Sequence, residues 1–169
     1  LPIWVVLVGI LVIAVLMWLL PFIPVNLFGA LIIVVFGFFF ATVSSRMVGA
    51  VGSSNNPISG MTIATLIAVC VLFKLTGNDS MESMIAAIVI GSVICIVAAM
   101  AGDTSQDLKT GFLVGATPKK QQIGEVIGVV ASAFAIGGTL YLLDSAWGFG
   151  SAELAAPQAT LMKMIIEGV

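Results

Sequence analysis

The sequence predicts an all-α membrane protein, a polytopic helical bundle of about five transmembrane spans with at least one discontinuous or re-entrant segment. Of its 169 residues, 60% are hydrophobic and 8% are charged, whereas about a quarter of the residues of a soluble domain are charged. The mean hydropathy is +1.24. The interruption is predicted by a polar stretch that ends at Pro57, because irregular backbone persists in a bilayer only where protein or a wet cavity surrounds it.

Five apolar stretches are long enough to cross the hydrocarbon core, which takes about 20 helical residues. They cover residues 3–20, 25–44, 58–75, 84–101 and 123–143. Trp4 and Trp18 lie near the ends of the first span, where indole rings favour the interface. Its remaining Val, Leu and Ile residues predict contact with lipid. Pro21 and Pro24 then end this helix.

The fourth and fifth spans carry small residues at helical spacing. In the fourth span these are Ala87, Gly91, Cys95 and Ala98. In the fifth span they are Gly124, Gly128, Ala131, Ser132 and Ala135. Small residues on one face let membrane helices approach closely. Both spans are therefore predicted to be interior helices.

Residues 49–57, the polar break, separate the second span from the third. Its serine and asparagine side chains offer hydrogen-bond donors and acceptors without full charge, which suits a polar substrate or a hydrated cation. The candidate substrate-binding residues are Ser53, Ser54, Asn55, Asn56, Pro57, Ser59, Gly60 and Thr62. Discontinuous helices form the binding sites of many secondary transporters. The alternative is a cytosolic loop in which Ser59 or Asn56 caps the next helix.

A second polar stretch, residues 102–122, is predicted to be a cytosolic loop. Asp103, Asp107 and Lys109 are the candidate coupling residues, because carboxylates at membrane boundaries often serve proton or ion relays. A local turn could bring this acid and base close together. The alternative is a solvated hairpin that Thr104 or Ser105 caps.

Charge distribution predicts the orientation and excludes several functions. Arg46, Lys109, Lys119 and Lys120 fall on one side if residues 102–122 are cytosolic, in agreement with the positive-inside rule. No basic patch suggests nucleic acid. The chain has no histidine and two cysteines, so neither a metal site nor another cofactor is expected. No second intramembrane aspartate accompanies Asp103, which argues against an aspartyl protease and predicts that the protein is not an enzyme.

Two blocks, in this order, carry a resemblance. SSNNPISGMTIATL at 53–66 and GDTSQDLKTGFLVGATPKKQQIGE at 102–125 are similar to segments of the oligopeptide transporter family, in particular of its bacterial members, and APQATLM at 156–162 looks like a third. The resemblance implies a multi-pass transporter of the cell (inner) membrane of a bacterium or archaeon, built from two related halves. It implies uptake of small peptides, or of metal complexes of amino-acid-derived chelators, coupled to protons.

The resemblance also assigns roles to residues. The run from Asn56 to Thr62 would line the pore as a discontinuous segment. A signature loop would contain Asp103, Gln106, Asp107, Lys109 and Thr110. Because relatives in this family are much longer, the chain is predicted to be a fragment, with the remaining part of the same transporter or further copies of itself as partners.

Three predictions stay open at this level. GSSNNP at 52–57 and GSAELAAP at 150–157 share a pattern, which hints at a second re-entrant segment over residues 148–166. The alternative there is an external loop with Trp147 as an interface anchor. The rival functions are a non-transporting scaffold or partner subunit, and an ion channel with residues 53–62 as its selectivity loop.

Overall fold

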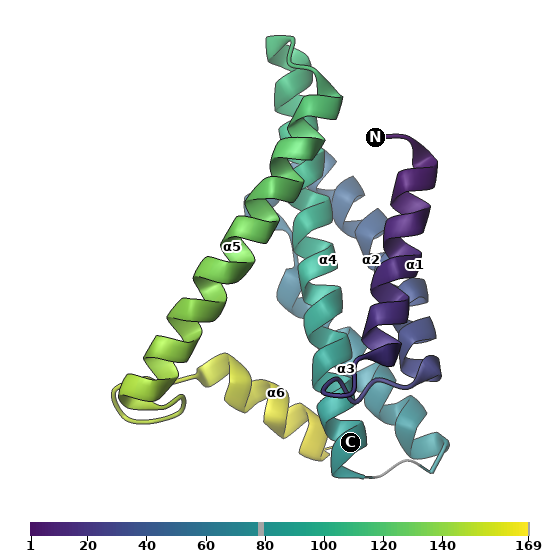
Figure 1. The fold of residues 1–169 in the computed structure, drawn as a ribbon. Coiled ribbons are helices and arrows are strands. Elements are labelled where there is room, and N and C mark those ends of the chain that lie inside the picture. Colours follow the sequence, from purple (N-terminus) through teal and green to yellow (C-terminus); the bar gives the residue numbers. More distant parts are fainter. Residues whose placement is uncertain (78–79, 169) are drawn as a thin grey trace.

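The computed structural model describes residues 1–77 and 80–168. Helices and their connections make up all of these residues. The helices are α1 (Ile3–Leu19), α2 (Leu27–Val51), the 3-10 helix η1 (Ser53–Asn55), α3 (Ile58–Leu75), α4 (Met81–Val114), α5 (Pro118–Trp147) and α6 (Pro157–Gly168). Helices α1 to α5 run alternately up and down in Figure 1. The predicted all-α class is confirmed.

The core lies where α2, α3 and α4 pack together (Figure 1). Helices α2 and α4 run in the same direction, because α3 returns the chain between them. Ile90 and Ile94 of α4 are fully buried, in one cluster with Ile33 of α2 and Val69 of α3. Helix α1 is apolar all round and has no buried residue, so it lies on the outside of this core.

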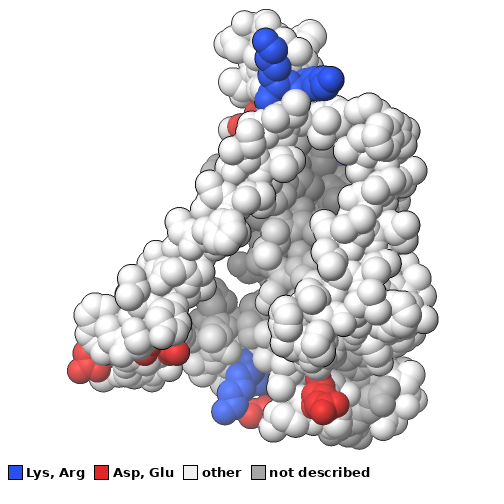
Figure 2. Space-filling model, viewed as in Figure 1, with Lys and Arg blue, Asp and Glu red and all other residues white. Residues whose placement is uncertain are grey.

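The charges leave a broad apolar belt. Figure 2 shows Lys, Arg, Asp and Glu gathered at the two ends of the molecule, with uncharged surface between them. Four helical segments are long and apolar enough to cross a bilayer: α2, η1 with α3, α4 and α5. Helix α1 is also apolar but only 17 residues long. A belt between two charged ends is what a bilayer requires.

Helix α4 corrects the prediction of a loop over residues 102–122. The helix continues without interruption to Val114, and only residues 115–117 of the expected loop are not helical. The chain turns at Gly115, which has the left-handed φ of +75° that ends many helices, and Pro118 begins α5. No helix breaker precedes Gly115, and 34 residues span about 51 Å at ~1.5 Å each, so the polar end projects beyond a core of about 30 Å.

Helix α5 leaves the bundle. It touches α4 near the α4–α5 turn and then leans away from it (Figure 1). No residue of α5 is buried, so the interior position predicted for the fifth span is wrong within this chain. Its small residues find no partner helix here to pack against.

Helix α6 follows an irregular connection over residues 148–156. It crosses one end of the bundle and packs against α3 and α4, where Ile166 is buried (Figure 1). Its 12 residues are too few to cross a bilayer. A second re-entrant segment over 148–166 stays a prediction.

Candidate functional site

The polar break connects α2 to α3 by a short irregular path. Helix α2 continues to Val51, and Gly52, with φ of +86°, turns the chain into η1. Helix α3 then begins after Pro57, and no side chain hydrogen bond caps it. The alternative in which Ser59 or Asn56 caps this helix is therefore wrong. The physical reason is that the Asn56 side chain is already bonded elsewhere in the bundle.

Asn56 reaches across the bundle and joins three helices. Its Nδ2 donates to Ser44 Oγ of α2 at 2.7 Å and to the carbonyl oxygen of Ala98 in α4 at 3.3 Å. The Ser44 hydroxyl, which is fully buried, donates to the same Ala98 oxygen. The Asn56 Oδ1 atom is also buried but accepts no hydrogen bond from the described residues. Buried polar atoms are nearly always paired, so this oxygen stands out.

Gly102 makes room for this contact. A Cβ atom at position 102 would lie 2.6 Å from Asn56 Nδ2 and 2.9 Å from Val48 Cγ2. Any larger residue in α4 would push the asparagine away. Gly102 is thus the residue of the signature segment, residues 102–125, that receives the polar break.

Two more hydrogen bonds tie the signature segment to the end of α2 and to the break. The Ser53 N–H donates to Gln106 Oε1 at 2.8 Å, and the Ser105 hydroxyl donates to the Ser45 carbonyl oxygen at 3.3 Å. The first bond satisfies an N–H at the start of η1, which has no partner inside its own helix. The two conserved-looking stretches of the sequence, 46 residues apart from Asn56 to Gly102 (102 − 56 = 46), therefore form one joint.

The predicted binding residues divide into an exposed group and a buried pair of contacts. Exposed are Ser54, Asn55, Pro57, Ser59 and Gly60. Ser53 and Asn56 are half-buried, whereas Thr62 is buried and its hydroxyl donates to the Ile58 carbonyl oxygen at 2.9 Å. The Thr62 hydroxyl is thus already used within α3.

The predicted coupling residues all lie on the exposed part of α4. Asp103, Asp107 and Lys109 are exposed, and none forms an ion pair within residues 1–77 and 80–168. Lys109 lies 5.6 Å from the centre of the Phe112 ring. The expected turn that brings acid and base together is wrong, because residues two apart on an α-helix point away from each other.

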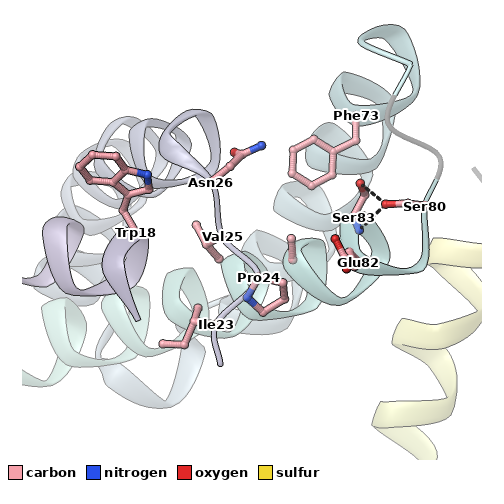
Figure 3. A pocket seen from close by; sticks show the side chains of 10 residues that line it. Trp18, Ile23, Pro24, Val25, Asn26, Phe73, Ser80, Glu82 and Ser83 are labelled. Atoms are coloured by element: carbon pink, nitrogen blue, oxygen red, sulfur yellow. Dashed lines mark hydrogen bonds between the residues drawn. The ribbon is translucent and has the colours of Figure 1, made fainter. Parts of the chain in front are cut away.

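A cavity of about 370 Å³ lies at the other end of the bundle (Figure 3). Trp18, Pro24 and Asn26 form one side, and Phe73, Glu82 and Ser83 form the other. It contains none of the predicted binding residues. In the described part of the chain, no three His, Cys, Asp or Glu side chains are grouped so as to hold a metal ion.

The sequence profile of the family described as "OPT oligopeptide transporter protein" matches residues 1–169. The chain belongs to the oligopeptide transporter family. A relative from Haemophilus influenzae, named "Putative oligopeptide transporter", is 38% identical over 152 residues, which cover 79% of this chain and 24% of the relative. The chain therefore spans about a quarter of the length of that family member. No solved structure matches the chain.

Membership in the oligopeptide transporter family, together with the apolar helices, identifies a multi-pass protein of the cell membrane. Sequence reasoning found the two stretches that meet in the joint but missed the residues that join them. These are Ser44, Gly102 and Ser105, while Gln106 was noted only through the family resemblance. One signal was present: Ser44 and Ser45 are adjacent hydroxyls at the end of an apolar helix, where a polar partner is needed.

Proposed function

We propose that this chain forms part of a secondary transporter that takes up small peptides together with protons by alternating access. Family membership supports the transport of oligopeptides. The observation that carries the proposal is the joint between the polar break and α4, in which Asn56 bonds across Gly102. A joint of this kind makes the break move with α4, as a substrate site between two moving bundles must.

The break offers neutral groups for a peptide. Ser54, Asn55 and Ser59 are exposed, and Asn56 carries a buried oxygen that accepts no bond from the described residues. A peptide N–H or ammonium group is the donor that such an oxygen lacks. Metal complexes of amino-acid-derived chelators are the second substrate class, because they present similar polar groups.

The position of the joint along α4 suggests which part of the path it serves. Gly102 lies 21 residues after Met81 (102 − 81 = 21), a rise of about 32 Å, close to the ~30 Å thickness of the hydrocarbon core. With the start of α4 at the outer surface, the break lies at the cytosolic surface. The site would then form the inner end of the substrate path.

The coupling role of Asp103, Asp107 and Lys109 belongs to the same proposal. All three lie on α4 just beyond the joint and are exposed. Exposed carboxylates at this boundary exchange protons with the cytosol directly, which suits the release side of a proton-coupled carrier.

The test is proton-driven uptake of radiolabelled di- to tetrapeptides by the complete gene product in proteoliposomes. We expect Gly60→Leu to abolish uptake without unfolding the protein, because Gly60 is exposed and a Cβ there meets nothing within 4 Å. Asn56→Ala should also abolish uptake, but it removes two hydrogen bonds, so its thermal stability is measured in parallel.

The matched control is Gly124→Leu, the same change at an exposed glycine of α5 with equally open surroundings. It should transport at the wild-type rate. Normal uptake by both Gly60→Leu and Asn56→Ala would contradict the proposed site. If the wild type moves neither peptides nor metal chelates, the scaffold alternative is favoured, and flux at channel rates in a planar bilayer would favour the channel.

A further inference from the structure

A strip of polar side chains fastens the start of α5 to the end of α4. Thr104 Oγ1 donates to Glu125 Oε2 at 2.9 Å, and Gln121 Nε2 donates to the Asp107 carbonyl oxygen at 3.0 Å. Thr104 and Asp107 are three residues apart on α4, and Gln121 and Glu125 are four apart on α5. Each pair thus lies on one face of its helix. The two faces meet beside the joint described above.

This strip controls the course of α5, because the rest of that helix lacks buried contacts. Helix α5 has no buried residue, and a Cβ at Gly128, Gly137 or Gly138 would meet nothing within 4 Å. After its first two turns α5 leans away from the bundle (Figure 1). A small change at the strip would therefore swing the far end of α5 through a large distance.

Glu125 is the ionisable member of the strip, and its carboxyl group is only half satisfied. Oε2 accepts the Thr104 hydrogen bond, whereas Oε1 is buried and has no partner among the described residues. A buried, unpaired charge costs much more free energy than the neutral acid. A protonated Glu125 suits this docked position, and an ionised one favours moving out to water.

No positive group compensates the Glu125 charge. The charged groups that the adjoining parts of α4, α5 and the amino terminus carry are Asp103, Asp107, Lys109, Lys119, Lys120 and the Leu1 ammonium. None of them forms an ion pair with Glu125 within the described residues, and the Leu1 ammonium donates to Gln122 instead.

We propose that Glu125 is a proton-carrying residue of the transporter, whose ionisation releases α5 from α4. This inference rests on the proposed proton-coupled function. Asp103 and Asp107 are exposed and not docked against a second helix through their side chains. Glu125 differs from them because losing its proton disrupts a helix contact. It is thus a positioning residue, which acts on α5 rather than on the substrate.

The decisive measurement is the distance between the far ends of α4 and α5 in the complete gene product in lipid vesicles. Spin labels at Met81 and Tyr141, which are 72% and 76% exposed, would report it after Cys70 and Cys95, both free thiols, are replaced by serine. We expect the distance distribution to shift between pH 5 and pH 8. Glu125→Gln, which mimics the neutral acid, should keep the acidic distribution at both values.

Two further variants separate this role from a general loss of structure. Thr104→Val keeps the shape but removes the hydroxyl, so the α4–α5 distance should resemble that of the wild type at pH 8. Thr104→Ser keeps the hydroxyl and should behave as the wild type. Glu153→Gln removes an exposed carboxylate from the loop after α5 and should retain the full pH-dependent shift.

Uptake gives a second readout. In Glu125→Gln the pH dependence of peptide uptake should be lost. The inference is overturned if Glu125→Gln keeps both the distance shift and the uptake profile, or if Asp107→Asn abolishes the shift while Glu125→Gln does not. A wild type that moves no peptide at any pH would contradict the proposed function, whereas the distance measurement would still test Glu125.

Discussion

Helices α4 and α5 have the same kind of sequence and opposite surroundings. In α4 the small residues Ala87, Gly91 and Ala98 are buried in the bundle. In α5 the corresponding small residues, such as Gly124 and Gly128, are exposed along the whole helix. Small residues at helical spacing thus allow close packing but do not ensure it. A complementary neighbour is also required.

The difference lies in the neighbours. Gly91 receives the side chain of Leu66, and Gly37 of α2 lies against Ile94, so bulky residues of one helix fill spaces on the next. Helix α5 meets only the end of α4, through polar groups. Three glycines of α4, Gly91, Gly102 and Gly111, face neighbours of decreasing rigidity. They allow the comparison to be tested in order of effect.

The largest effect is expected for Gly91→Leu. A Cβ at this position would lie 2.9 Å from Leu66 Cδ2, and Leu66 is 2% exposed and cannot move aside. Overpacking of this kind costs about 3 kcal/mol or more for a whole leucine side chain. Gly128→Leu in α5, where a Cβ meets nothing within 4 Å, should change stability by less than ~1 kcal/mol.

Thermal unfolding of the two purified variants in the same detergent measures this contrast. A Gly128→Leu variant as unstable as Gly91→Leu would show that α5 packs as tightly as α4 in the complete protein. The comparison between the two helices would then describe this chain alone.

Gly102→Ala is expected to have the second effect. The new methyl group would displace the Asn56 amide, which lies 2.6 Å from the ideal Cβ position, and break its bonds to Ser44 and Ala98. The loss should be about 1–3 kcal/mol, because buried polar groups are left unpaired. Gly124→Ala in α5 gains helix propensity, worth up to ~1 kcal/mol, and should be slightly more stable than the wild type.

The measurement is again the unfolding midpoint in detergent. If Gly102→Ala and Gly124→Ala unfold at the same temperature, the Asn56 contact does not hold the break against α4. The proposed joint would then lose its structural basis.

Composition and periodicity predicted the class of the fold well, because the bilayer dictates both apolar length and helical backbone. They failed at the end of α4. Residues 102–114 are polar and were expected to form a loop, but polarity alone does not break a helix, and the first breaker is Gly115. Helix ends depend on backbone-breaking residues more than on polarity.

The candidate site was predictable only as two separate stretches. Asn56 stood out before a proline, but its partners Ser44 and Gly102 are 12 and 46 residues away and have no local pattern that pairs them. Glu125 had no evident role, because its Thr104 contact crosses a turn that was expected elsewhere. Contacts between helices depend on register, which the apolar pattern of a membrane helix barely specifies.

The smallest effect is expected for Gly111→Ala, where α4 meets α5. A Cβ there would lie 2.1 Å from Gln121 Oε1, but this atom is the end of a flexible side chain that can swing out. Losing the Gln121 bond to Asp107 costs about 1 kcal/mol, which the helix propensity of alanine, also worth about 1 kcal/mol, offsets. The unfolding midpoint should stay unchanged while the α4–α5 distance, reported from Met81 and Tyr141, increases. Gln121→Ala should give the same distance change, since it removes the same contact. A loss of stability as large as that of Gly102→Ala would show that Gln121 is held as firmly as Asn56, and that α5 is anchored more rigidly than the exposed surface of its remaining length implies.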